Sequence, residues 1–238
     1  TRWALASFIG RLNYAYKDNY IFTFTGRYDG NSRYAEGHKW GFFPSVSAAW
    51  NVSSEQFMKQ ITWIDNLKLR LGYGLAGNQG GIDSYTTMNL VRPNGVAPVG
   101  NSPVVTYETL RNINPDLKWE VKHTFNAGFD VGFYGNRLLL SVNYYNSKTT
   151  DMLYNYRVSV PPFTYNTLLA NIGSMRNSGT EISVGITPLK TKDMELNINA
   201  NITFQKNKLL SLNGMYNGEY ISASEYTVIA GLDGAGFH

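Results

Sequence analysis

The sequence predicts an all-β fold, one wall of an antiparallel transmembrane β-barrel with about eight strands. Apolar and polar residues alternate with period two in one segment after another. The clearest of these segments match the ~9–11 residues that a membrane-crossing strand needs, whereas strands of soluble domains usually run ~5–6 residues. The connections between the segments are mostly short and long in turn, as in outer-membrane barrels with short periplasmic turns and long external loops.

The segment from Trp40 to Asn51 shows the alternation most plainly. One face is apolar and begins and ends with an indole, Trp40 and Trp50, whereas the other face is mostly small and polar. Aromatic residues at both ends of a strand are typical of the girdles at the two membrane interfaces. A core strand of a soluble sandwich would alternate in the same way, so the other segments must decide between the two folds.

Eight segments carry the alternation. In chain order they span residues 5–16, 20–28, 40–52, 66–78, 119–133, 138–146, 172–186 and 196–205. Tight polar turns at Lys17–Asn19 and Tyr134–Asn136 mark the periplasmic side. The strand that begins at Leu138 is expected to extend through Tyr156, until the tandem prolines Pro161–Pro162 end it.

Two connections differ from simple turns. Residues 53–65 are expected to hold one helical turn at 56–59, capped by Ser53 or Ser54. Residues 77–117 are rich in Gly, Pro, Asn and Ser and show no strong period, which predicts one very long loop. A loop of this length argues against a compact soluble domain, but it is normal on the outer face of a barrel.

The composition excludes several classes of protein. With 14% aromatic and 16% charged residues the chain is not disordered, and it contains no run of ~18 apolar residues that would form a membrane helix. The net charge of +4 is small and its basic residues are scattered, so no nucleic-acid partner is expected. The chain has no cysteine and therefore no disulfide or thiol chemistry.

No motif in the sequence predicts catalysis, a metal or a cofactor. The histidines His38, His123 and His238 are far apart and lack the spacing of metal ligands. The glycine-rich stretch 77–81 lacks the Gly-Lys-Ser/Thr ending of a phosphate-binding loop. Ser178 and its neighbours near Glu181 have no nucleophile-elbow pattern, so the chain is not predicted to be an enzyme.

Six blocks of the sequence resemble the SusC/RagA family of TonB-dependent outer-membrane transporters of Bacteroidetes. In family order they are RYDGNSRY (27–34), WGFFPSVS (40–47), NLKLRLGYGLAGNQ (66–79), NPDLKWE (114–120), NIG (171–173) and RNSGTE (176–181). Ala76 and Thr180 depart mildly from the family pattern. The blocks span most of the chain, which makes the resemblance highly specific.

The resemblance implies an internal fragment of a larger, roughly 22-stranded plugged barrel. The plug, the TonB box and the amino-terminal accessory domain have no counterpart in residues 1–238, and residues 231–238 look like mid-loop sequence. The implied function is active import of oligosaccharides, or of peptides, across the outer membrane of a Gram-negative cell. The implied partners are a SusD-like surface lipoprotein and, through the plug, the TonB-ExbB-ExbD complex.

Two sets of residues are candidates for function. Side chains in loops are candidates for substrate contact, by stacking on sugar rings or by hydrogen bonding, or else pack within the loops: Tyr34, Asn78, Gln79, Asp83, Tyr85 and Tyr107. Charged side chains on the polar strand faces are expected to line the lumen, where they form ion pairs or meet the plug: Arg11, Arg27, Lys68, Arg70, Glu120, Lys122 and Glu181.

Two alternatives remain open from sequence alone. A soluble all-β carbohydrate-binding module or adhesin would fold in water without detergent. A TonB-dependent receptor for iron-siderophore complexes would keep the same architecture and change only the cargo.

Overall fold

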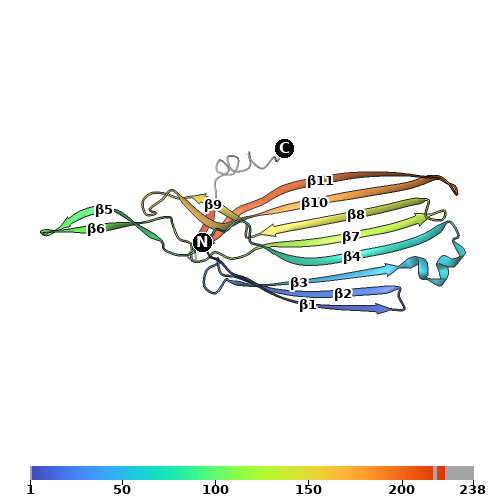
Figure 1. Ribbon diagram of the computed structural model, residues 1–238, viewed down its shortest axis with the longest axis horizontal. Helices are drawn as coiled ribbons and strands as arrows, with labels where there is room; N and C mark the ends of the chain where they lie inside the picture. Colours follow the sequence, from blue (N-terminus) through green and yellow to red (C-terminus); the bar gives the residue numbers. More distant parts are fainter. Residues whose placement is uncertain (1, 217–218, 223–238) are drawn as a thin grey trace.

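A computed structural model describes residues 2–216 and 219–222, and its main element is one long antiparallel sheet (Figure 1). Eight long strands lie side by side in the order β1-β2-β3-β4-β7-β8-β10-β11. Their bounds are β1 (Leu5–Tyr16), β2 (Tyr20–Asn31), β3 (Trp40–Asn51), β4 (Ile64–Asn78), β7 (Glu120–Phe133), β8 (Leu138–Thr150), β10 (Thr167–Lys190) and β11 (Glu195–Tyr216). The predicted all-β, antiparallel wall is confirmed.

Four shorter strands complete the described fold. β9 (Leu153–Arg157) pairs with the first residues of β10, and β12 (Glu219–Ser222) pairs with the end of β11. β5 (Val91–Val99) and β6 (Ser102–Thr109) form a separate hairpin that projects beyond the long-loop end of the sheet (Figure 1).

The β5–β6 hairpin corrects one prediction from the sequence. Residues 77–117 were expected to form one unstructured loop, and this is wrong for residues 91–109. The valines of this segment favour a strand, but Pro93, Pro98 and Pro103 interrupt the period-two signal. Prolines are tolerated because both strands of a two-stranded ribbon are edges.

Several long strands extend further than predicted, mostly at the long-loop end. β2 continues to Asn31 and β11 to Tyr216, whereas β10 begins at Thr167 rather than near Ile172. The extra residues lack clear apolar alternation, so the sequence pattern did not reveal them. At the long-loop end the strands of the sheet therefore continue beyond the band of apolar residues. The expected single strand from Leu138 through Tyr156 is wrong: β8 ends at Thr150, Asp151 has a positive φ of 55°, and β9 is a separate strand.

The strand register separates two faces of the sheet. Residues paired across neighbouring strands share a face, and one row across all eight strands consists of Tyr14, Phe22, Ala48, Leu71, Ala127, Tyr144, Thr180 and Phe204. The adjacent row on the other face consists of Asn13, Thr23, Ser47, Gly72, Asn126, Tyr145, Gly179 and Gln205. We call these the apolar face and the polar face.

The apolar face is exposed although it is rich in large hydrophobic residues. Leu12 keeps 69% and Phe24 50% of its surface accessible.

The rows of paired residues run obliquely across the sheet: Tyr16, the last residue of β1, lies in one row with Ile202, which is well inside β11. Such a stagger is what tilted strands of a barrel wall require.

The short-turn end of the sheet carries the helical turns. A 3₁₀ helix η1 (Val52–Ser54) precedes η2 (Gln56–Gln60), which confirms the expected helical turn. The predicted serine cap is wrong, because Glu55 occupies the position before η2 and neither 3₁₀ helix has a side-chain cap hydrogen bond. Within the described residues no helix has the length and apolarity to cross a membrane.

Glu55 instead accepts hydrogen bonds from the ends of the neighbouring strands. Trp50 Nε1 donates at 3.2 Å, Tyr20 Oη at 2.9 Å and Asn19 Nδ2 at 3.3 Å. These bonds, that from Trp50 foremost, lower the pKa of the Glu55 carboxyl group below its ordinary value of 4.5. The ionised carboxylate thus ties segment 52–60 to β2 and β3.

We expect the stabilisation from these hydrogen bonds to Glu55 to depend on pH. Because the folded-state pKa is lowered, the stabilisation is present above the ordinary pKa and is lost as the pH falls through the folded-state pKa. Tryptophan fluorescence between pH 6 and pH 3 should therefore change less in Glu55→Gln than in the wild type. Ser54→Ala should keep the wild-type profile, and identical profiles for Glu55→Gln and the wild type would contradict the assignment.

Candidate functional site

A small hydrophobic core lies at the long-loop end, where loops pack on the diverging strands. Tyr34, Phe43 and Trp119 form its centre, with ring centroids 4.8 Å apart for Tyr34–Trp119 and 5.5 Å for Phe43–Trp119. Ile82 and Leu117 are buried against them. We call these five residues the loop core.

The loop core forms because β3 and β4 separate towards this end. Their pairing reaches only Ser45 and Gly74, and Phe43 fills the space beyond. A Cβ atom at Gly77 would lie 2.2 Å from the Phe43 ring, so this position requires glycine. Trp119 is buried beside Phe43, and its Nε1 donates to the Lys39 carbonyl at 3.2 Å.

Tyr34 is buried, which agrees with the alternative that it packs within the loops. Only 1% of its surface is accessible, and its hydroxyl donates to the Asn78 carbonyl oxygen at 3.0 Å. Burial raises the pKa of Tyr34 to about 12. A buried, hydrogen-bonded tyrosine supports the loops and does not offer a ring for a ligand to stack on.

Asn78 and Gln79 also hold the loops together. Gln79 Oε1 accepts from Asn31 Nδ2 at 2.7 Å and from Arg33 Nη2 at 3.3 Å. Asn78 Nδ2 donates to Glu120 Oε1 at 3.0 Å. The side chains of these two candidates for substrate contact thus form hydrogen bonds within the protein.

A second set of bonds fixes the 114–118 segment to β10. Asn171 Oδ1 accepts from the Lys118 backbone N–H at 2.9 Å, while its Nδ2 donates to the carbonyls of Lys118 and Asp151, both at 2.8 Å. Asn114 Nδ2 donates to the Leu169 carbonyl at 2.9 Å. Since both asparagines are buried, the sequence blocks NPDLKWE and NIG act as connectors.

The three remaining loop candidates do not converge. Tyr107 is 64% exposed on the projecting hairpin, and the hydroxyl of Tyr85 accepts from the Arg2 backbone N–H at 3.3 Å. Asp83 lines a polar cavity of about 330 Å³ together with Gly81, Thr86, Leu110, Arg111, Asn112, Asn155, Thr167 and Leu169. Sequence reasoning missed Arg111 and Asn155, since no motif marks them.

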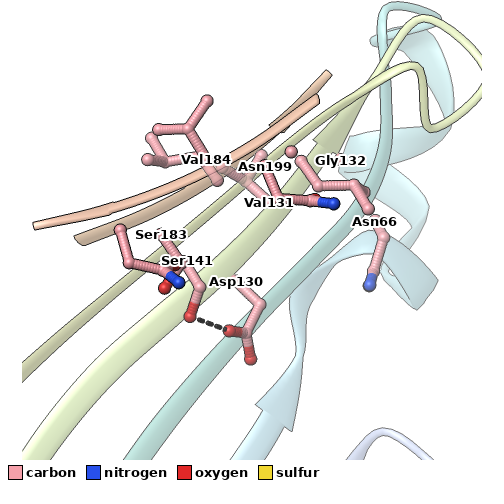
Figure 2. Close-up of a pocket in the computed structure, with 12 residues that line it drawn as sticks. Asn66, Asp130, Val131, Gly132, Ser141, Ser183, Val184 and Asn199 are labelled. Atoms are coloured by element: carbon pink, nitrogen blue, oxygen red, sulfur yellow. Dashed lines mark hydrogen bonds between the residues drawn. The ribbon is translucent and has the colours of Figure 1, made fainter. Parts of the chain in front are cut away.

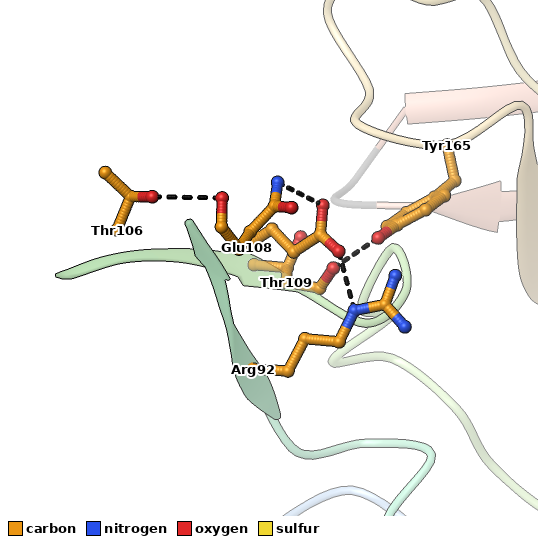
Figure 3. A network of polar contacts seen from close by, with 6 residues as sticks. Arg92, Thr106, Glu108, Thr109 and Tyr165 are labelled. Carbon is orange, nitrogen blue, oxygen red and sulfur yellow. Dashed lines mark hydrogen bonds and ion pairs between the residues drawn. The ribbon is translucent and has the colours of Figure 1, made fainter. Parts of the chain in front are cut away.

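Polar contacts hold the base of the β5–β6 hairpin in place (Figure 3). Glu108 accepts from Arg92 Nε at 2.6 Å and from Asn94 Nδ2 at 2.8 Å. Tyr165 Oη donates to the carbonyl of Thr109. The loop between β9 and β10 thereby anchors the hairpin.

All seven charged side chains predicted for the lumen belong to the polar face by register: Arg11, Arg27, Lys68, Arg70, Glu120, Lys122 and Glu181. Arg70 is the most connected. Its Nη2 donates to Asp130 Oδ1 at 2.9 Å and to Asn143 Oδ1 at 2.8 Å, and Ser141 Oγ donates to Asp130 at 2.7 Å. Arg27 pairs with Asp29 at 2.7 Å.

Small residues hollow the polar face around this network. One hollow of about 320 Å³ is lined by Asn66, Asp130, Ser141, Ser183 and Asn199, among others (Figure 2). A second, of about 450 Å³, lies between Lys68, Arg70 and Glu181. The polar face thus presents charged and hydrogen-bonding groups along a broad trough.

No cluster in the described residues has the composition of a metal site with three or more His, Cys, Asp or Glu side chains. His123 lies on the apolar face, where its Nδ1 shares a hydrogen bond of 2.9 Å with the Tyr73 hydroxyl. His238 lies outside the described residues.

Comparison with known proteins gives the family. The family model described as TonB dependent receptor-like, beta-barrel matches residues 1–237. The chain belongs to this family. TonB-dependent receptor SusC of Bacteroides thetaiotaomicron is 37% identical over 92% of this chain and 22% of its own length. TonB-dependent receptor P26 of Formosa agariphila is 38% identical over 89% of this chain and 21% of its own length.

Solved structures agree with this family assignment. The structure of the RagAB peptide transporter is similar to this chain with a TM-score of 0.77 and 27% sequence identity. The match covers 93% of this chain and 25% of the RagAB chain. Its open-open state matches with a TM-score of 0.80. These likenesses confirm the SusC/RagA resemblance, and the chain spans about a fifth of the length of the curated relatives it matches.

Proposed function

We propose that the chain is part of the barrel wall of an outer-membrane importer of oligosaccharides or peptides. The observation that carries this proposal is the two-faced sheet, with exposed hydrophobic residues on one side and charged hollows on the other. Lipid covers the apolar face and the polar face lines the lumen, as in known barrels. The long loops then lie outside the cell and the short turns in the periplasm.

In this proposed function the chain works together with other parts of a transport machinery. A longer chain supplies the other strands and a plug, which fills the trough beside Arg70 and connects to TonB-ExbB-ExbD. A SusD-like lipoprotein covers the outer loops. The SusC and RagAB relatives support both partners. The importer passes its cargo without a chemical reaction on it and needs no cofactor.

The cavity beside Asp83 is our preferred place for cargo contact within this chain. Asp83 and Arg111 bring opposite charges to one polar cavity without forming an ion pair with each other. Asn155 adds an amide, and all three belong to the long-loop end. Such groups suit the hydroxyls of a sugar or the amides of a peptide.

The double variant Asp83→Asn/Arg111→Gln tests this cavity. Losing two charged hydrogen-bonding groups should raise the cargo concentration for half-maximal uptake by about tenfold or more. The matched variant Asp193→Asn/Lys192→Gln, in the turn between β10 and β11, should leave uptake unchanged. Equal uptake constants for the cavity variant and the wild type would remove the cavity from the transport path.

Deletion of the gene tests the function itself. The deletion strain should lose uptake of one class of oligosaccharide or peptide, and the complemented strain should regain it. Unchanged uptake of every glycan and peptide would contradict the proposal. Growth rescue by ferric chelates alone would point to siderophore import, and folding of the protein in water without detergent would support a soluble binding module.

A further inference from the structure

The apolar face ends in basic residues at the long-loop end of three neighbouring strands. Along β11 the apolar positions continue from Leu196 to Phe204, and the next two positions on the same face are lysines. In β8 and β10 the apolar face likewise becomes basic on the long-loop side of Tyr144 and Thr180. The residues concerned, which we call the basic cluster, are Lys148, Arg176, Lys206 and Lys208.

The register brings these cations together. Arg176 pairs with Lys148 on one side and with Lys208 on the other, and adjacent strands lie ~4.8 Å apart. Lys206 precedes Lys208 by two positions and therefore shares its face. All four side chains are exposed, and Figure 1 shows β8, β10 and β11 side by side.

The cluster has no compensating charge in the part of the chain that the structure describes. None of its four side chains forms an ion pair or hydrogen bond there. The positions of β8, β10 and β11 on the apolar face carry no Asp or Glu, and Glu181 lies on the polar face. Because like charges directly opposite each other destabilise a sheet, the arrangement calls for an external anion.

We propose that the basic cluster binds the phosphate groups of an anionic glycolipid headgroup in the outer leaflet. The inference rests on the proposed function, which places the apolar band in the bilayer and the long loops outside. The apolar run of β11 is about as long as the ~9–11 residues of a membrane-crossing strand. The cations that follow it lie at the depth of lipid headgroups.

Chemistry and position together favour a lipid over a soluble anion. An arginine fork flanked by lysines matches phosphate oxygens, and basic clusters beside a membrane-embedded surface attract anionic headgroups. Acyl chains of the same lipid would cover the adjacent exposed residues Phe204 and Tyr144. A free phosphate ion would gain nothing from this apolar surface.

Binding of a diphosphoryl lipid A to the full transporter in non-ionic detergent tests the proposal. The wild type is compared with a cluster variant, Lys148→Gln/Arg176→Gln/Lys206→Gln/Lys208→Gln. A control variant removes equal charge at the short-turn end, Lys17→Gln/Lys59→Gln/Lys190→Gln/Lys192→Gln. The cluster variant should bind this lipid about tenfold or more weakly, whereas the control should bind like the wild type.

Two further ligands separate the sources of phosphate. The same lipid A without its phosphates should bind the wild type as weakly as the cluster variant binds the intact lipid. Inorganic phosphate at equal concentration should not displace the lipid. Equal affinity of the cluster variant and the wild type would overturn the lipid site, and so would displacement by inorganic phosphate.

Folding and location are measured on the same proteins. The cluster variant should remain heat-modifiable and should melt in lipid-free detergent no lower than the wild type, because it loses repulsion. If it does not fold, the smaller variant Lys206→Gln/Lys208→Gln replaces it and should still bind the lipid several-fold more weakly. If the wild-type protein is absent from the outer membrane, the proposed function is overturned as well. If the wild-type protein is in the outer membrane but binds the lipid no more tightly than the cluster variant, only the lipid site is overturned.

Discussion

Trp119→Ala should destabilise the outer end of the sheet more than any other single truncation of a side chain. Trp119 is buried against Tyr34 and Phe43, and its loss also leaves the Lys39 carbonyl without its donor. Truncations of this kind cost about 3–5 kcal/mol. In the full transporter, protease cleavage within residues 32–39 and 79–90 should accelerate strongly, and the heat-modifiable band should disappear at lower temperature.

Trp63→Ala is the matched control for this experiment. Trp63 stacks on Phe133 at the opposite end of the sheet, but half of its surface is exposed. Its truncation should cost less and should leave cleavage of the outer loops unchanged. Equal sensitivity of the outer loops in both variants would show that the loop core does not hold them.

Asn171→Leu should have the second-largest effect. The substitution keeps the approximate volume of the side chain but removes three hydrogen bonds, leaving the Lys118 N–H and C=O and the Asp151 C=O unpaired. Since an unsatisfied buried polar group costs about 1–3 kcal/mol, the total should reach several kcal/mol. Hydrogen exchange of the Lys118 amide should rise accordingly.

Asn126→Leu provides the comparison for Asn171. Asn126 is exposed on the polar face of β7, where it lines a hollow. Its replacement should leave exchange at Lys118 unchanged. A slow Lys118 amide in Asn171→Leu would mean that other contacts fix the 114–118 segment.

The strands were predictable because their chemistry is local and periodic. In Trp40–Asn51 and in 196–205, each residue reports which face it occupies. The β5–β6 hairpin escaped prediction because its prolines erase the period. The long-loop ends of β2, β10 and β11 were not predicted, because strands beyond the apolar band no longer need an apolar face.

The site was predicted less well, because contacts between distant loops leave no periodic signal. Tyr34, Asn78 and Gln79 looked like exposed polar or aromatic loop residues, yet each makes contacts with residues distant in sequence. Arg111 and Asn155 join Asp83 in a cavity only through folding. The seven charged residues expected in the lumen share the polar face, because strand parity alone assigns them to one side of the sheet; that this side is the lumen stays a prediction.

The orientation of the two faces is tested most directly by single cysteines along β11. Residues 1–238 contain no cysteine, so within this chain each label reports one position, once any cysteine elsewhere in the transporter has been replaced. We expect a water-soluble maleimide to modify 197, 199, 201 and 203 through the lumen, but not 198, 200, 202 and 204 in the bilayer. Positions 206 and 208 should react in intact cells. Equal reactivity of both sets, or reactivity of the even set alone, would contradict a lipid-facing apolar side.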